Sequence, residues 1–222
     1  MTETVTLQTP VTAKDDMPSL DLVLILQQMA ATIDALSASA SPNAGGVIVG
    51  QYYDNSFDGG NNFALAGAAD RLDMAPFYTS KRMRIDEIGV LVSTAVAASL
   101  LRCFIYGSDD NGWPDDLLFE GAGDLVSSST GFKFHALDFT FDSGRQYWLG
   151  VRQSSTAAFR SVNTSSAINL GLSSSGGTSY FTVLRRTLAF ATPLPASWVF
   201  VSGDRDANIT PPSIRMRAAA LP

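Results

Sequence analysis

The stretch FIYGSDDNGWPDDLLFEGAG, residues 104–123, gathers the side chains best suited to chemistry. Its polar residues are four aspartates and an asparagine around a tryptophan: Asp109, Asp110, Asn111, Trp113, Asp115 and Asp116. Carboxylates can hold a calcium ion, and acids and amides beside an indole can bind a sugar. The same residues, with Gly112 and Pro114, also favour a tight turn between two strands.

A calcium loop of the EF-hand type fits this stretch poorly. With Gly112 at the sixth position, Asp109 and Asn111 fall at the third and fifth, where ligands are needed. Gly107 and Leu118 then fall at the first and twelfth positions, which require acidic ligands. The sequence therefore rejects an EF-hand and predicts no metal or other cofactor. A looser calcium site stays open as an alternative, built from Asp109, Asp110, Asp115 or Asp116.

A sugar-binding loop is the second interpretation. Trp113 would offer an apolar platform, and Asp109, Asn111 and Asp115 would bond the sugar hydroxyls. The third interpretation is a turn between a strand that ends near residue 107 and another that begins near residue 117. Because residues 109–112, Asp-Asp-Asn-Gly, tolerate unusual backbone angles and Pro114 fixes the exit from the turn, this interpretation is favoured.

Other catalytic chemistry finds little support in the sequence. The chain has one cysteine, Cys103, and one histidine, His135, so a catalytic triad or a zinc site is nearly excluded. P-loop, HExxH, GxSxG and CxxC patterns are absent. We expect a protein that is not an enzyme. Paired carboxylates of a glycosidase stay open, with these acids available: Asp109, Asp115, Asp116, Glu120 and Asp138.

The charge of the chain argues against two classes of binding partner. Only 16% of residues are charged, the net charge is −6, and there is no lysine or arginine run. Binding to nucleic acid or to an anionic membrane surface is therefore not expected. The apolar run 22–26 is short and follows net negative residues, so we expect no signal peptide and synthesis in the cytosol.

The first 46 residues differ from the rest of the chain. Residues 1–16 resemble an extended arm that would order by joining a neighbour's sheet or groove, and a flexible terminus stays open as the alternative. A helix is predicted for 17–38, and its apolar residues follow heptad spacing: Leu22, Leu26, Met29, Ile33 and Leu36. This helix needs a partner, which would be either its own β domain or, as we favour, copies of itself in a trimer. Residues 39–46 are a small, polar linker.

Residues 47–222 predict a mainly β domain. Turn-rich stretches separate short apolar runs, and no helical pattern lies between them, so an antiparallel jelly-roll sandwich is expected. A phase slip predicts a β-bulge near Asp86–Glu87. Tyr52 and Tyr53 are expected to pack in the core. The predicted strands are 47–53, 72–78, 82–94, 99–107, 117–121, 131–141, 145–153, 167–172, 179–190, 197–202 and 213–218.

A part of this β region resembles a known family. The string from RIDEIGVLVST through LLRCFIYGSDDNGWPDDLLFEG to GFKFHALDFTFDSGRQYWLGVRQS is similar to a jelly-roll domain of tailed-bacteriophage virion proteins. It has an Ile105-Tyr106 strand end, a Gly/Asp/Pro turn, a Leu117-Leu118 strand and a Tyr147-Trp148-Leu149 strand. The resemblance covers about 70 of the 222 residues. It implies a non-enzymatic virion component and carries over no catalytic residue.

These observations lead to two functional hypotheses. The first is a structural virion protein, a projecting fibre, spike or decoration protein that self-associates, is anchored by its N-terminal region and contacts other virion proteins. The alternative is an adhesin whose loops bind host-surface polysaccharide through Asp109, Asn111, Trp113 and Asp115.

Overall fold

The structure is a computed structural model that describes residues 25, 27–29, 46–56, 63–164, 167, 168, 170, 181–207 and 209–221. The chain divides into two compact units, Met1–Ser39 and Ala40–Pro222. In the first unit, residues 25 and 27–29 are α-helical, and Ile25 and Met29 are exposed. Several predictions lie outside the described residues: the arm 1–16, most of the helix with Leu22, Leu26, Ile33 and Leu36, and the linker up to residue 45.

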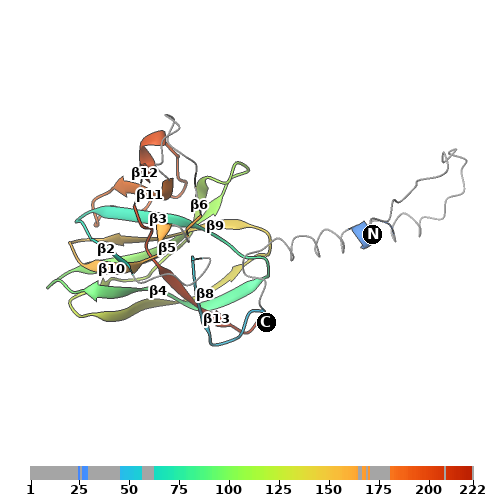
Figure 1. Cartoon of the computed structure of the whole chain (residues 1–222), viewed down its shortest axis with the longest axis horizontal. Coiled ribbons are helices and arrows are strands. Elements are labelled where there is room, and N and C mark those ends of the chain that lie inside the picture. The colour runs from blue at the N-terminus through green and yellow to red at the C-terminus, as the bar shows by residue number, and fades with distance from the viewer. Residues whose placement is uncertain are drawn as a thin grey trace, which may run out of the picture. The chain divides into compact units, whose positions relative to one another are not determined.

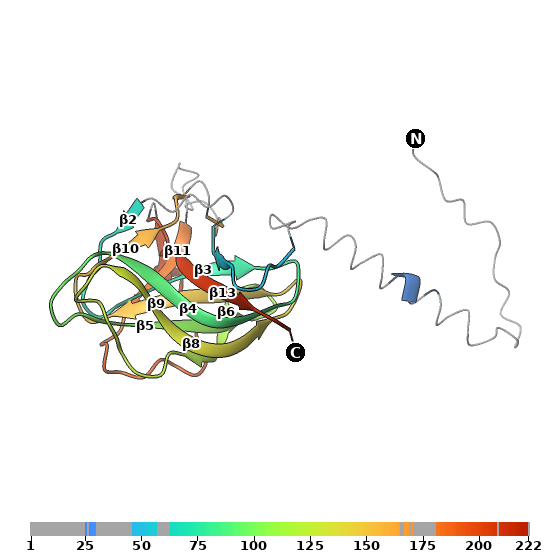
Figure 2. The same cartoon turned by 90° about the horizontal axis from the view of Figure 1, so that it is seen from below.

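The second unit is a sandwich of two antiparallel sheets (Figures 1 and 2). The six-stranded sheet runs β1 (Tyr52–Asp54), β13 (Ile214–Ala219), β4 (Met83–Thr94), β10 (Ala158–Ser161) and β2 (Phe63–Leu65), with β8 (Gly131–Phe141) on the other edge of β4. The seven-stranded sheet runs β12 (Arg205–Ala207), β11 (Phe181–Thr187), β3 (Arg71–Tyr78), β9 (Gln146–Gln153), β5 (Leu100–Ser108) and β6 (Pro114–Glu120), with β7 (Leu125–Val126) beside β5.

The strand order is that of a jelly roll, as predicted. One sheet contains the order β3-β9-β5-β6, and the other contains β1-β13-β4-β8. Along the chain, β3, β4, β5 and then β8 and β9 alternate between the two sheets, which produces the two Greek keys of this fold. The sandwich prediction is therefore confirmed.

One strand of the jelly roll is interrupted by a long insertion. β10 and β13 follow one another along the same edge of β4, since Phe159 pairs with Val92 and Ile214 with Val90. The insertion comprises residues 162–213, and its described residues supply β11 and β12 to the opposite sheet. β1 and β2 divide the neighbouring strand in the same way, because β1 pairs with β13 and β2 with β10.

The sandwich has two apolar cores because the insertion covers the outer face of the seven-stranded sheet. The inner core lies between the sheets and includes Ile85, Ile88, Cys103 and Phe141, all fully buried. Odd and even residues of one strand point to opposite faces. The second core therefore takes the alternate residues of β3, β5 and β9 together with Leu184, Leu194 and Trp198 of the insertion.

The structure confirms most of the long strands and corrects several short ones. The predicted strand 131–141 coincides with β8, and register shifts confirm the bulge at residues 86–87. The prediction for 47–53 is wrong for residues 47–51, and 197–202 forms a single bridge at Ser197, followed by the 3₁₀ helix η2 (Ser202–Asp204). Residues 167, 168 and 170, described parts of the predicted strand 167–172, are not in a strand.

Four strands were not predicted, and each has four residues or fewer: β2, β7, β10 and β12. None of the helical residues in the described ranges belongs to a helix long and apolar enough to cross a membrane.

Candidate functional site

Residues 109–113 of the aspartate-rich stretch form a tight turn between β5 and β6. β6 begins at Pro114, earlier than the predicted start near residue 117, so Asp115 and Asp116 lie in the strand. The Oδ1 atom of Asp109 accepts hydrogen bonds from the backbone N–H groups of Asn111 at 2.9 Å and Trp113 at 2.7 Å. The backbone N–H of Asp109 donates to the carbonyl of Trp113 at 2.8 Å, and Gly112 adopts a positive φ of 82°. Because the Asp109 carboxylate closes the turn, the favoured turn interpretation is confirmed.

Trp113 packs onto the second core. Its ring lies parallel to that of Phe200, with centroids 3.9 Å apart and planes at 6°, and the ring of Trp148 lies 6.3 Å away. The Nε1 atom of Trp148 donates to the carbonyl of Gly112 at 3.0 Å. One face of the indole, which the sugar-binding interpretation assigns to a ligand, therefore carries Phe200.

Asp115 forms hydrogen bonds with residues of the insertion. The Ser197 hydroxyl donates to Oδ1 of Asp115 at 2.9 Å, and the backbone N–H of Trp198 donates to its carbonyl at 2.7 Å. Asp109, Asn111 and Trp113 thus share one turn, whereas the Asp115 carboxylate bonds residue 197. Within the described ranges, no three histidine, cysteine or acidic side chains form a group suited to a metal ion.

Cys103 and His135 are both buried. Burial raises the pKa of the Cys103 thiol to about 12, which keeps it protonated and unreactive at neutral pH. The His135 ring lies 6.4 Å from that of Phe119, and its Nε2 atom is buried without a hydrogen-bond partner. Burial and the charge of Arg102 lower the pKa of His135, so its neutral form is favoured.

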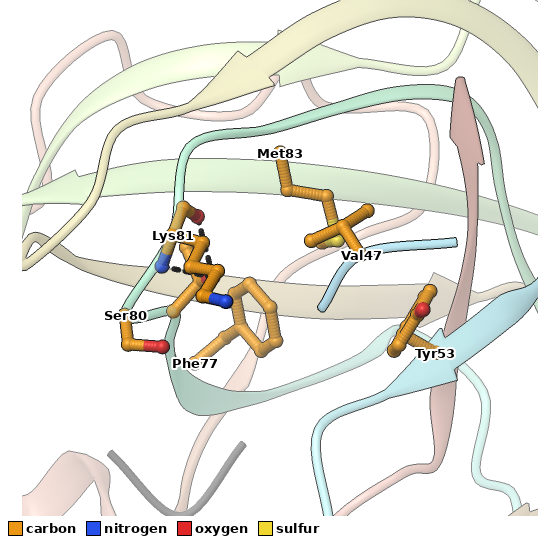
Figure 3. Close-up of a pocket in the computed structure, with 7 residues that line it drawn as sticks. Val47, Tyr53, Phe77, Ser80, Lys81 and Met83 are labelled. Atoms are coloured by element: carbon orange, nitrogen blue, oxygen red, sulfur yellow. Dashed lines mark hydrogen bonds between the residues drawn. The ribbon is translucent and has the colours of Figure 1, made fainter. Parts of the chain in front are cut away.

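A small pocket lies beside the turn between β3 and β4 (Figure 3). Four of its lining residues are apolar or aromatic: Val47, Tyr53, Phe77 and Met83. The hydroxyl of Thr79 donates to the carbonyl of Lys81 at 2.7 Å. The pocket volume of about 20 Å³ suits one water molecule rather than an organic ligand.

The outer face of the six-stranded sheet displays aromatic side chains. Tyr52 from β1 meets Phe132 from β8 edge to face at 5.2 Å, and Phe132 stacks on Phe134 at 5.6 Å. Tyr52 is 45% exposed and Phe134 is 43% exposed. We call these three residues the aromatic patch. Exposed apolar surface of this kind often marks a contact with another molecule.

Ion pairs border the aromatic patch. The bulge in β4 turns the Asp86 and Glu87 carboxylates to the same face, where Arg217 bonds both at 2.8 Å. The Tyr52 hydroxyl donates to Glu87, and this hydrogen bond raises the pKa of Tyr52. The hydrogen bonds from Arg217 lower the pKa of Asp86. The hydrogen bond to Glu87 holds the Tyr52 hydroxyl against the sheet, while the ring of Tyr52 contacts Phe132 of the aromatic patch.

Sequence reasoning did not identify the aromatic patch. Tyr53 packs against the inner core as predicted, but Tyr52 points to the opposite face and is exposed. The alternation of Phe132 and Phe134 with Lys133 and His135 was the available signal, because alternate residues of a strand share a face. The third residue of the patch, Tyr52, precedes Phe132 by 80 residues in the sequence. It reaches the patch only because the strands between them pair.

No protein-family model matches this sequence, and no curated protein sequence matches it.

Proposed function

We propose that this protein is a structural component of a bacteriophage virion, a projecting fibre, spike or decoration protein. Its N-terminal region anchors it, and its copies associate, with a trimer favoured. The jelly-roll unit is the part that projects.

The aromatic patch is the observation that carries this proposal. Tyr52 and Phe134 are each more than two-fifths exposed on the outer face of the six-stranded sheet. Surface of this kind suits contact with another macromolecule better than binding of a small molecule, which uses recessed pockets. The pocket between β3 and β4 has room for one water molecule.

Two further observations support the proposal. The chain consists of two compact units, as expected for an anchor joined to a projecting body. The larger unit has jelly-roll strand order, which is the fold that the resemblance to virion proteins implies. The residues that resemble that family span β4 to β9 of the unit.

Removal of residues 1–38 tests the anchoring role. We expect the full chain to sediment at about three times its mass of 23.6 kDa and the shortened chain to sediment as a folded monomer. Sedimentation velocity gives the mass, and circular dichroism shows whether the β structure is retained. A monomeric full chain would contradict self-association.

Immunogold electron microscopy of purified particles tests the virion location. Antibody raised against residues 40–222 is expected to label a projection on the particle surface. Particles that contain no copy of the chain by mass spectrometry would overturn the proposal.

Host-surface glycan binding is a second candidate function, favoured by the exposed ring of Tyr52. An aromatic ring beside the Arg217–Glu87 ion pair offers both an apolar platform and hydrogen-bonding groups for a sugar. A glycan array with the full chain, Tyr52→Ala and Trp113→Ala tests it. Loss of binding in Tyr52→Ala would assign the sheet face, and loss in Trp113→Ala would assign the predicted loop.

A further inference from the structure

β8 forms an open edge of the six-stranded sheet over eleven residues (Figure 2). Its backbone pairs with β4 on one side, and among the described residues no backbone hydrogen bond reaches its other side. Natural edge strands usually carry proline, inward-pointing charge or a covering segment, which prevents unwanted pairing. β8 contains no proline, and Asp138 bonds Arg84 on the outer face at 2.7 Å. Its one inward-facing charge is Lys133, which pairs with the buried Val90 near the start of the strand and donates to the Ser129 hydroxyl at 2.8 Å.

Apolar side chains accompany this open edge. Leu137 and Phe139 of β8, Phe119 of β6 and Leu125 of β7 pack against the inner core but remain partly exposed. Val126, next to Leu125, is 53% exposed. A strand laid along β8 would therefore gain backbone hydrogen bonds and would also cover apolar side chains.

The chain itself contains a segment with the required pattern. Residues 2–9, TETVTLQT, alternate Val5 and Leu7 with Thr4 and Thr6. Val and Thr favour strands, and the alternation would place Val5 and Leu7 toward Phe119 while the threonines face outward. The segment holds one charged residue, Glu3, so pairing buries little charge.

The segment can reach a neighbouring copy. The predicted helix 17–38 would span about 33 Å, which is comparable to the diameter of a small domain. An arm given to one neighbour and received from another is a head-to-tail contact, and such contacts form a closed ring when the rotation between copies closes, as it would in the proposed trimer.

We infer that β8 is the acceptor strand for residues 4–8 of a neighbouring copy, which extend the six-stranded sheet by one strand. This inference rests on the self-association in the proposed function. In this arrangement, β8 of one copy binds the N-terminal arm of the next copy.

Disulfide trapping tests the inference with full-length chains. Thr6→Cys places a thiol on the outward face of the arm, and Ala136→Cys places one on the exposed outer face of β8. The two singly substituted chains are refolded together and treated with a mild oxidant. We expect a disulfide-linked pair that contains one chain of each kind. The native Cys103 is fully buried and does not compete.

Ala64→Cys provides the matched control. Ala64 is an exposed alanine on β2, at the opposite edge of the same sheet. The yield of the linked pair with Ala136→Cys is expected to exceed that with Ala64→Cys at least tenfold. Equal yields would show random collision and would overturn the inference.

Other outcomes separate the remaining explanations. Chains that associate by sedimentation but give no Thr6–Ala136 cross-link would overturn the acceptor role of β8 and leave the proposed function standing. A chain that sediments as a monomer would overturn both. Cross-linking of Ala136→Cys with itself would assign the edge to a second β8 and would overturn the inference. A third chain that carries both Thr6→Cys and Ala136→Cys tests the arm of the same copy, and a cross-link found only within single copies of it would also overturn the inference.

Discussion

His135 is the single histidine of the chain, and it lies buried between the two sheets with Nε2 unpartnered. Burial and Arg102 lower its pKa, whereas Asp124 and Glu120 act in the opposite direction. The folded state therefore favours the neutral ring, and unfolding takes up a proton once the pH falls below the ordinary value of 6.5. Acid should weaken the fold through this residue before the carboxylates titrate.

The first prediction concerns this pH dependence. As the pH falls from 7.5 to 5.5, the free energy of unfolding should decrease by up to about 1.4 kcal/mol per pH unit below pH 6.5. Urea unfolding at several pH values measures this slope. In His135→Leu the slope over this range should be nearly absent. An unchanged slope in that variant would assign the effect to other groups.

Gly150 shows how a single missing side chain shapes the second core. It lies in β9, where a Cβ atom would overlap the ring of Phe104 and lie 2.9 Å from the Cβ of Met74. Both neighbours are fully buried and cannot move aside without disturbing the sheet.

The second prediction follows from this close contact. Gly150→Ala should lower the free energy of unfolding by about 1–3 kcal/mol through overpacking. Gly107→Ala in β5 is the control, because its Cβ would find its nearest neighbour, Leu118, at 3.5 Å. Chemical denaturation of both variants compares them. A loss in Gly107→Ala as large as that in Gly150→Ala would exclude overpacking as the cause.

At the scale of elements, the insertion 162–213 acts as a cover for the seven-stranded sheet. Trp198 is 3% exposed and meets Tyr106 edge to face at 5.5 Å. The guanidinium of Arg186 lies 3.8 Å from the centre of the Trp198 ring, and the Tyr106 hydroxyl donates to the carbonyl of Pro195 at 2.8 Å. These contacts bind the irregular segment to the sheet beneath it.

The third prediction tests this cover. Trp198→Ala should cost about 3–5 kcal/mol of unfolding free energy, because it removes a large buried ring. Val199→Ala, at a neighbouring position that is 73% exposed, should change stability by less than about 0.5 kcal/mol. Urea denaturation measures both. Similar values for the two variants would show that the segment contributes little to the fold.

At the scale of the whole molecule, the inner core joins both sheets of the second unit into one body. Cys103 lies on β5 in the inner core and is fully buried, so a reagent reaches its thiol only if the sheets separate. Its buried thiol therefore reports the opening of the sandwich as a unit.

The fourth prediction uses this thiol. In native buffer, alkylation of Cys103 should be at least about a thousandfold slower than in concentrated denaturant, in line with the stability typical of folded domains. Mass spectrometry of the alkylated fraction over time measures the rate. Rapid labelling under native conditions would contradict a closed inner core.

Long strands of the sandwich were predictable because their signal is local. In residues 131–141, apolar residues alternate and turn residues bound the run, so β8 could be placed residue by residue. The same local logic predicted the bulge at residues 86–87, since two apolar residues of one face were three positions apart. Absence of a helical pattern between the strands predicted the sandwich.

Pairing between strands that are distant in sequence could not be predicted from local patterns. β2 and β10 are three and four residues long and exist because they pair with one another, about 95 residues apart in sequence. Phe200 covers the ring of Trp113 only after the insertion folds back over the sheet. Tyr52 and Phe134 share one face because β13 and β4 lie between their strands. The periodicity of a chain assigns residues to the faces of its own strand, whereas the neighbours of each face depend on which strands pair.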